Sequence, residues 1–246
     1  MHFETVQSVT HYSDFLFSFT TSKSEEFRQF KAGQFTMIGM GDDDLLRAYS
    51  IASAPQANHL EFLSIKMPGG ALTSRLQKIA VGDEIEVTNR PTGTLVLDNL
   101  TPGKRLWCLA TGTGLAPFLS IVRDPLTFSR FEEVVVTHTV RTCSELAYAE
   151  MLIGLPIHYY PTVTREEFFA TGRITDHIDD GSLFASLGID RWNPQEDRVM
   201  LCGSHSFNND LKQRLDLAGF SHGSNRQSGS YVQERAYVTT SMAAVV

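Results

Sequence analysis

Cysteine, basic charge and long apolar runs are all scarce in this chain of 246 residues. The three cysteines, Cys108, Cys143 and Cys202, cannot supply the four thiolates of a plant-type iron–sulfur cluster, and their spacing matches no paired metal-ligand motif. The formal net charge of −7 argues against nucleic-acid binding, because domains that bind nucleic acid carry a basic excess. We therefore expect neither a bound metal nor a nucleic-acid partner.

Signals for membrane insertion and secretion are also lacking. No apolar run approaches the roughly 20 residues that span a bilayer, and the first residues show no basic and apolar signal pattern. An odd number of cysteines without such a signal is typical of a reducing compartment. The sequence thus predicts a cytoplasmic protein without a membrane segment.

The first hundred residues contain short apolar runs separated by glycine-containing turns. A helix is expected over residues 72–79. Strands are expected over residues 14–19, 34–39, 59–67, 84–88 and 94–97. Strands spaced this closely are typical of a small barrel or sandwich.

The pattern changes after Pro102 and Gly103, where expected strands alternate with expected helices. The strands are residues 106–110, 133–140, 157–163 and 198–202. The helices are residues 117–122, 146–153 and 208–218. This alternation predicts a doubly wound parallel sheet, so we divide the chain into domains of residues 1–100 and 101–246.

The segment of residues 47–53 combines a cation, an aromatic ring and a small hydroxyl. In a strand, Arg47 and Tyr49 share one face and Ser50 lies on the other. A guanidinium can bind a phosphate, a tyrosine ring can lie against a planar cofactor, and a hydroxyl can hydrogen-bond a ring nitrogen. These groups suit a flavin nucleotide, and an ordinary half-buried strand is the alternative.

Two glycine-containing turns could receive phosphate groups. Residues 111–117 (Thr-Gly-Thr-Gly-Leu-Ala-Pro) lie between an expected strand and helix, where backbone amides can approach a pyrophosphate. Pro117 replaces the third glycine of the standard dinucleotide motif but suits a first helical turn. Residues 69–74 form a second such turn, with an ordinary capped helix as the alternative.

Three arginines follow strands expected in the second half of the chain. Arg141, Arg165 and Arg173 fall beyond the carboxyl ends of these strands, where a parallel sheet displays its ligand. Together they suit a phosphate monoester such as the 2′-phosphate of NADP. Surface cations paired with Glu166 or Glu167 are the alternative.

In order and spacing, these motifs resemble those of the bacterial ferredoxin–NADP(H) reductases and the wider flavin-reductase superfamily. The resemblance covers nearly the whole chain. It rests on residues 32–35 (Ala-Gly-Gln-Phe), 47–50 (Arg-Ala-Tyr-Ser), 64–66, 72–76, 91–95, 110–118, 201–204 (Leu-Cys-Gly-Ser) and 231–238.

The resemblance implies an α+β two-domain fold. A six-stranded antiparallel β-barrel binds FAD, and an α/β doubly wound parallel sheet binds NADP(H), with the C-terminal tail over the flavin. The implied FAD-binding residues are Arg47, Tyr49, Ser50, Ser64, Ile65, Lys66, Ala71, Leu72, Thr73, Ser74, Thr113, Ala236 and Tyr237. The implied NADP(H)-binding residues are Thr111, Gly112, Thr113, Gly114, Arg141, Thr164, Arg165, Arg173, Cys202, Gly203 and Ser204. The implied catalytic residues are Ser50, Tyr49, Cys202, Ala236 and Tyr237.

The implied reaction is hydride transfer between nicotinamide C4 and flavin N5, with Ser50 beside N5 and Tyr49 stacked on the flavin. Single electrons then pass to or from ferredoxin or flavodoxin in a transient, electrostatic complex, and the enzyme is expected to be a monomer. Two features depart from the family pattern: Tyr237 stands where phenylalanine is usual, and residues 204–207 (Ser-His-Ser-Phe) replace an Asn-Pro or Ser-Pro pair.

Three other functions fit parts of the sequence. A reductase of free flavin or of an oxygenase belongs to the same superfamily and could use NADH, but the three arginines argue against NADH. A flavin relay subunit without nucleotide turnover would be yellow and would not be bleached by NADPH. A plain Rossmann dehydrogenase would leave the β-rich half unexplained.

Overall fold

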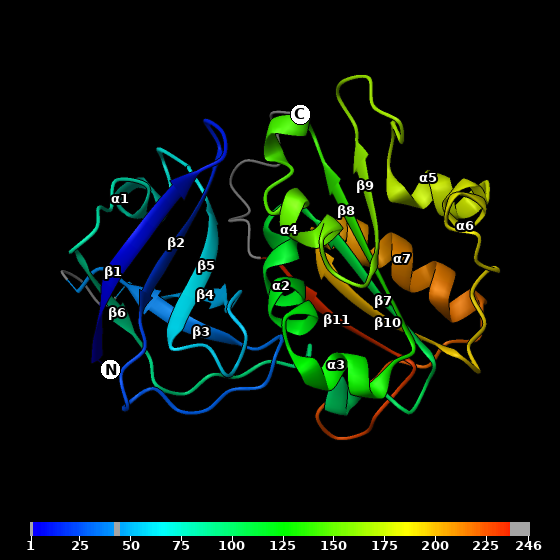
Figure 1. Cartoon of the computed structure of the whole chain (residues 1–246), viewed down its shortest axis with the longest axis horizontal. Helices are drawn as coiled ribbons and strands as arrows, with labels where there is room; N and C mark the ends of the chain where they lie inside the picture. The colour runs from blue at the N-terminus through cyan, green and yellow to red at the C-terminus, as the bar shows by residue number, and fades with distance from the viewer. Residues whose placement is uncertain (1, 42–44, 237–246) are drawn as a thin grey trace.

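The computed structural model describes residues 2–41 and 45–236. Two β-sheets lie side by side, one in each half of the chain (Figure 1). The segment between them contains the 3-10 helix η1 (Leu97–Asn99). The predicted domain boundary after residue 100 falls in this segment and stays a prediction.

Six antiparallel strands form the first sheet, in the order β4-β3-β6-β1-β2-β5. They are β1 (His2–His11), β2 (Leu16–Ser22), β3 (Phe35–Gly39), β4 (Arg47–Ser50), β5 (His59–Ile65) and β6 (Glu84–Val87), with helix α1 (Thr73–Leu76) after β5. The edge strands meet, because the Ala52 amide just beyond β4 donates to the Glu61 carbonyl of β5 at 2.8 Å. Phe17, Phe19 and Phe62 fill the interior, so the sheet is a closed barrel.

Five parallel strands form the second sheet, in the order β11-β10-β7-β8-β9. They are β7 (Arg105–Thr111), β8 (Glu133–Val140), β9 (His158–Val163), β10 (Asp197–Gly203) and β11 (Tyr231–Arg235). The strands β8 and β10 are buried almost throughout. Such continuous burial is expected where helices cover both faces of a parallel sheet.

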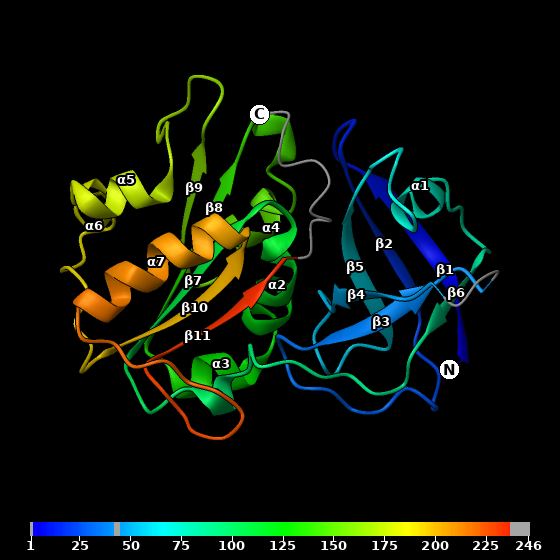
Figure 2. The same cartoon turned by 180° about the vertical axis from the view of Figure 1, so that it is seen from behind.

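Helices do cover both faces of this sheet. One face carries α2 (Ala116–Val122), α3 (Pro125–Arg130) and α4 (Ala149–Ile153), and the other carries α5 (Ile174–Asp179), α6 (Ser182–Leu187) and α7 (His205–Leu217) (Figure 2). Alternate residues of β7 join different cores: Cys108 packs with α2, and Trp107 and Leu109 pack with α7. The predicted fold class, a barrel followed by a doubly wound sheet, is confirmed.

Individual elements differ from the predictions. The strand expected over residues 94–97 is wrong, because this segment is irregular and leads into η1. The helix expected over residues 72–79 is shorter than predicted, because only Thr73–Leu76 (α1) is α-helical. The strands β1 and β11 and the helices α3, α5 and α6 were not predicted, and β1 is the true sixth strand of the barrel.

A polar network joins the two domains. The Glu61 carboxylate of β5 accepts hydrogen bonds from the Tyr148 hydroxyl at 2.8 Å and from Arg123, which follows α2. The Arg123 guanidinium also lies over the Tyr148 ring, 5.4 Å from its centroid. These contacts tie α2 to the barrel.

A membrane-spanning helix and a three-ligand metal cluster are both absent from the described residues. In residues 2–41 and 45–236, none of the helices combines the length and apolar character needed to cross a membrane. That part of the chain also brings no three His, Cys, Asp or Glu side chains together as metal ligands. All three cysteines are free thiols, of which Cys108 and Cys202 are buried and Cys143 is exposed.

Candidate active site

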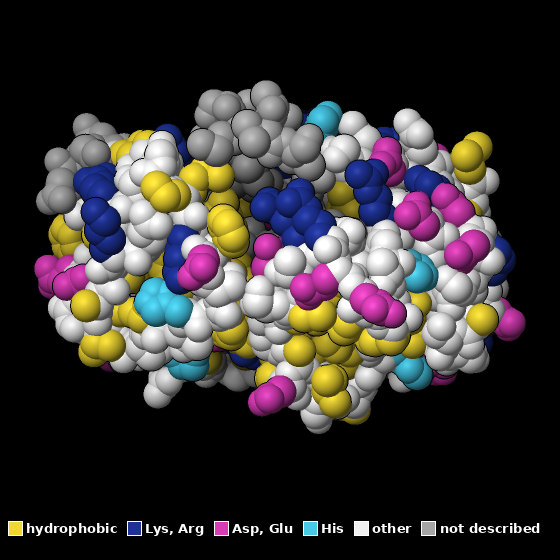
Figure 3. Space-filling view, turned by 90° about the horizontal axis from the view of Figure 1, so that it is seen from above, with side chains coloured by type: hydrophobic (Ala, Val, Ile, Leu, Met, Phe, Trp, Pro, Cys, Tyr) yellow, Lys and Arg dark blue, Asp and Glu magenta, His cyan; other side chains and the backbone are white. Residues whose placement is uncertain are grey.

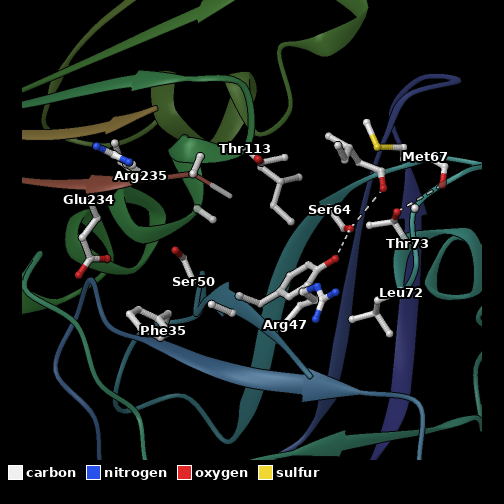
Figure 4. Close-up of a pocket in the computed structure, with 18 of the residues that line it drawn as sticks. Phe35, Arg47, Ser50, Ser64, Met67, Leu72, Thr73, Thr113, Glu234 and Arg235 are labelled. Atoms are coloured by element: carbon white, nitrogen blue, oxygen red, sulfur yellow. Dashed lines mark hydrogen bonds between the residues drawn. The ribbon is translucent and has the colours of Figure 1, made fainter. Parts of the chain in front are cut away.

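A cavity of about 410 Å³ lies where the barrel meets the parallel sheet (Figure 4). The barrel contributes β4, the end of β5 and the turn before α1. The parallel sheet contributes Thr113, Cys202 and the residues from Gln233 to Ala236 at the end of β11. Both domains therefore build one site from segments far apart in the sequence.

The β4 strand carries the residues of the predicted flavin motif into this cavity. The Tyr49 hydroxyl lies 3.0 Å from the Ser64 hydroxyl, and the Tyr49 ring meets Phe62 edge-on. Together these contacts fix the plane of the ring, and burial raises the pKa of Tyr49. Arg47 is exposed and donates to the Leu46 carbonyl at 2.9 Å. In Figure 4, Ser50 lies between Arg47 and the Glu234–Arg235 side of the cavity.

The turn before α1 forms another wall of the cavity. A Cβ atom on Gly70 would lie 2.0 Å from the Thr73 hydroxyl oxygen, so a larger residue there would displace the Thr73 side chain. The Thr73 hydroxyl donates to the Met67 carbonyl at 3.3 Å, and Leu72 inserts into the barrel core. Ala71, Leu72 and Thr73 thus reach the cavity on an anchored backbone.

The glycine turn after β7 packs tightly on one side and is open on the other. A Cβ on Gly114 would lie 2.1 Å from the Cys202 carbonyl oxygen, and one on Gly203 would lie 2.4 Å from the Thr111 hydroxyl. Gly112, in contrast, has φ +51° and no atom within 4 Å of its Cβ position. The ends of β7 and β10 are therefore held together, while open space remains above Gly112.

Glu234 joins the end of β11 to the barrel. Its carboxylate accepts hydrogen bonds from the Thr94 amide, from the Thr94 hydroxyl at 3.2 Å and from the Leu95 amide at 3.2 Å. Burial raises the pKa of Glu234 despite these donors. The next residue but one, Ala236, donates its amide to the Gly203 carbonyl at 3.0 Å, which places it beside the nucleotide turn.

The three arginines lie at the end of the sheet to which β8 and β9 point. The Arg165 amide donates to the Arg141 carbonyl at 2.9 Å, and Arg173 immediately precedes α5. All three are exposed, and within the described residues no carboxylate forms an ion pair with them. Glu166 instead accepts a hydrogen bond from the Cys143 amide. Lys and Arg side chains gather near the middle of this face in Figure 3.

Most of the predicted FAD-binding residues line the cavity. Those that line it are Arg47, Tyr49, Ser50, Ser64, Ile65, Ala71, Leu72, Thr73, Thr113 and Ala236. Lys66 and Ser74 do not line it. The Lys66 ammonium instead donates to the Ser13 carbonyl at 2.6 Å. Tyr237 and the tail beyond it lie outside the described residues.

Of the predicted NADP(H)-binding residues, Thr113 and Cys202 line the cavity and the others lie outside its wall. Thr111, Gly112, Gly114, Gly203 and Ser204 form the adjoining turns, and the Ser204 amide donates to the Thr111 hydroxyl at 3.3 Å. Thr164, whose amide donates to the Val140 carbonyl at 3.0 Å, precedes Arg165 at the arginine face.

Several lining residues were not predicted as site residues. They are Phe35, Ala48, Leu63, Met67, Gly70, Ala116, Gln233, Glu234 and Arg235. Phe35, Gln233, Glu234 and Arg235 do belong to the sequence segments that carry the resemblance. Their roles depend on β11 meeting the barrel, which no local pattern indicates.

Two family models match the chain, one in each domain. Residues 3–96 match the oxidoreductase FAD-binding domain, and residues 108–213 match the oxidoreductase NAD-binding domain. The two matches fall on the two sheets that line the cavity.

Known proteins give the same result over nearly the full length. The chain is 48% identical to the ferredoxin–NADP reductase of Pseudomonas aeruginosa, covering 97% of this chain and 98% of that protein. It is 47% identical to the flavodoxin/ferredoxin–NADP reductase of Rhodobacter capsulatus, covering 96% and 93%. A crystal structure of a ferredoxin–NADP+ reductase from Neisseria gonorrhoeae with bound FAD and NADP matches with a TM-score of 0.90 and 31% identity, covering 96% of this chain and 98% of that one. The resemblance seen in the sequence is thus confirmed, and the chain belongs to the ferredoxin–NADP reductase family.

Proposed function

We propose that this protein is an FAD-dependent reductase that moves electrons between NADP(H) and ferredoxin or flavodoxin. One observation carries the proposal: Tyr49 and Ser50 of the barrel share a single cavity with Thr113 and Cys202 of the parallel sheet. Hydride transfer requires its donor and acceptor to be in contact. A cavity lined by both cofactor domains meets that requirement.

The residues of the barrel side fit FAD. Arg47 has no carboxylate partner in the described residues, so its guanidinium is available to a pyrophosphate. Tyr49 presents a ring whose plane is fixed by Ser64 and Phe62. Ala71, Leu72 and Thr73 would hold phosphate from the anchored turn. Gln233 adds a buried side-chain oxygen that lacks a hydrogen-bond partner in the described part of the chain. When bound, FAD supplies the chemistry by accepting a hydride and releasing electrons singly.

The residues of the sheet side fit NADP(H). Arg141, Arg165 and Arg173 are exposed and form no ion pair with a carboxylate of the described residues, so they would bind the 2′-phosphate. The open face of the turn at Gly112 would receive the pyrophosphate. Cys202 and Gly203 would line the nicotinamide slot.

The protein contributes positioning rather than proton transfer. Burial raises the pKa of Cys202, so its thiol stays neutral and serves as a small wall of the slot. The Glu234 carboxylate is committed to the Thr94 and Leu95 amides, so it orients the two domains. Ser50 would hydrogen-bond the flavin where the hydride arrives.

The proposal includes the cellular location, the oligomeric state and the redox partner of the protein. A reducing cytoplasm suits three free thiols, one of which, Cys143, is exposed. A monomer suffices because one chain lines the whole cavity. A transient complex with ferredoxin or flavodoxin would be strengthened at low salt, since exposed charges steer such encounters.

An anaerobic titration tests the proposal. Purified protein is titrated with NADPH and then with NADH while the visible flavin absorption is followed. Bleaching by NADPH at much lower concentration than by NADH is the expected result. Equal bleaching by both would favour a free-flavin or oxygenase reductase, and a yellow protein bleached by neither would favour a relay subunit. A colourless protein that cannot bind added FAD would contradict the proposal entirely.

A further inference from the structure

His138 is a fully buried histidine in the middle of the second sheet. It lies on β8 between Ala110 of β7 and Pro161 of β9, and its side chain has no exposed surface. Its Nε2 lies 3.0 Å from the carbonyl oxygen of Gly112, the first residue of the 3-10 helix η2 (Gly112–Leu115). A titratable side chain thus lies directly beneath the nucleotide turn.

The surroundings of His138 fix its tautomer. A carbonyl oxygen only accepts hydrogen bonds, so Nε2 carries the proton and donates it. Nδ1 is buried and has no hydrogen-bond partner in the described residues, so this nitrogen is unprotonated and its lone pair accepts no hydrogen bond there. Burial lowers the pKa of His138 to about 4, although the bond to Gly112 opposes that shift. At neutral pH the His138 side chain is therefore uncharged, and its Nε2–H donates a hydrogen bond.

This donor helps to set which way the next peptide faces, in addition to the i→i+3 bonding of η2 itself. In a trans peptide the C=O of one residue and the N–H of the following residue point in opposite directions. With the Gly112 carbonyl held towards His138, the Thr113 amide points away from the sheet. The first amides of a helix have no acceptor within it, so this one is free to bind a ligand.

Gly112 allows this peptide to tilt. Its φ of +51° places it in the left-handed region, and nothing lies within 4 Å of its Cβ position. Rotation about ψ of Gly112 meets little steric resistance, whereas a complete flip would also force the β-branched Thr113 to a positive φ. The motion that the His138 bond opposes is therefore a tilt, which would turn the Thr113 amide away from an anionic ligand.

We propose that His138 is a positioning residue that locks the Gly112–Thr113 peptide, so that the Thr113 amide is presented to the pyrophosphate of the dinucleotide. The inference deepens the proposed function and rests on it. It differs from the arginine site in one testable respect. His138 acts on the pyrophosphate, whereas the arginines act on the 2′-phosphate.

Two ligands separate these contributions. NADP+ contains both the 2′-phosphate and the pyrophosphate, whereas adenosine 2′-monophosphate contains only the former. Dissociation constants for both are measured with the FAD-loaded wild type and with His138→Leu, His138→Gln and Thr137→Val. The Gln amide can replace the Nε2 donor. Thr137→Val is the matched control, because Thr137 is the adjacent buried residue and its hydroxyl has no partner in the described residues.

His138→Leu is expected to weaken NADP+ binding about tenfold and to leave adenosine 2′-monophosphate binding within about twofold. His138→Gln should restore NADP+ binding to within about threefold of wild type, and Thr137→Val should match wild type. If His138→Leu does not fold, His138→Asn replaces it, since its shorter amide cannot reach the Gly112 oxygen.

Three results would overturn the inference. These are unchanged NADP+ binding in His138→Leu, equal weakening of both ligands, and no recovery in His138→Gln. A wild-type protein that bound neither ligand would instead overturn the proposed function, and this inference with it.

Discussion

The two sides of the active site are built differently. On the barrel side, Tyr49 is bonded to Ser64 and packed on Phe62, and Leu72 is fixed in the barrel core. On the sheet side, Arg141, Arg165 and Arg173 stand exposed without carboxylate partners in the described residues. A preorganised site loses little entropy on binding, whereas free arginine side chains lose more. The difference suits a cofactor that stays bound on the barrel side and a nucleotide that exchanges on the sheet side.

Removing an arginine should affect only the exchanging ligand. Arg165→Ala is expected to raise KM for NADPH on the order of 10- to 100-fold, because a charge-assisted bond to phosphate is lost. FAD content and the KM for NADH should not change. Steady-state kinetics with both nucleotides measure this, and Arg165→Lys, which keeps only the charge, should fall between wild type and alanine. Equal losses for NADPH and NADH would remove Arg165 from the 2′-phosphate site.

Removing the Ser50 hydroxyl tests whether the two sides meet in the reaction. Ser50→Ala is expected to retain FAD but to slow hydride transfer about tenfold, the effect of one hydrogen bond made in the transition state. Stopped-flow reduction by saturating NADPH measures the step directly. An unchanged rate would show that Ser50 only lines the cavity.

Loosening the Tyr49 ring should make the resident cofactor exchange faster. Tyr49→Phe removes the bond to Ser64 and should lower the free energy of unfolding by about 1 kcal/mol. Tyr12→Phe is a matched control, because the Tyr12 hydroxyl lies 3.2 Å from that of Ser18 and Tyr12 does not line the cavity. Both variants should lose similar stability, but only Tyr49→Phe should release FAD faster. Similar FAD release from the two variants would refute a specific role for the Tyr49 hydroxyl.

The smallest expected effect is a pH dependence that originates on the sheet side. The pKa of His138 is lowered to about 4 in the folded protein, so between that value and its ordinary value near 6.5 the unfolded chain binds more protons. Stability from His138 is therefore lost as pH falls through this window. Relative to His138→Gln, wild type should lose up to about 1 kcal/mol between pH 6.5 and 5.5. Chemical denaturation of both proteins across this range would show it, and parallel curves would contradict it.

Local patterns predicted the segments whose role is set by their own residues. The sequence of β4 indicated a strand with a flavin motif, and the valine-rich run of β8 indicated a buried parallel strand with the observed bounds. Arg141, Arg165 and Arg173 were predicted from the ends of expected strands. In the described residues Arg165 forms no ion pair with Glu166, whose carboxylate accepts a hydrogen bond from the amide of residue 143. The role of the three arginines at a 2′-phosphate stays a prediction.

Patterns failed where distant residues decide the structure. Residues 94–97 form a short apolar run that resembles a strand. Glu234, however, accepts hydrogen bonds from the Thr94 and Leu95 amides that a strand would use in a ladder. The β1 strand was missed because its buried positions include Glu4, which counts as polar in any pattern. Hydrogen bonds from Ser22 and Ser24 satisfy that carboxylate. Neither arrangement can be read from neighbouring residues.

The bond between Glu234 and the barrel loop sets an order of events during synthesis. Residues 2–87 contain the described barrel strands and leave the ribosome well before Glu234 and Ala236, which complete the cavity. N-terminal domains fold while later segments are still being made. The loop at Thr94 and Leu95 of a nascent barrel therefore remains without its Glu234 partner until β11 has emerged. Cofactor capture in its final form consequently follows the synthesis of β11.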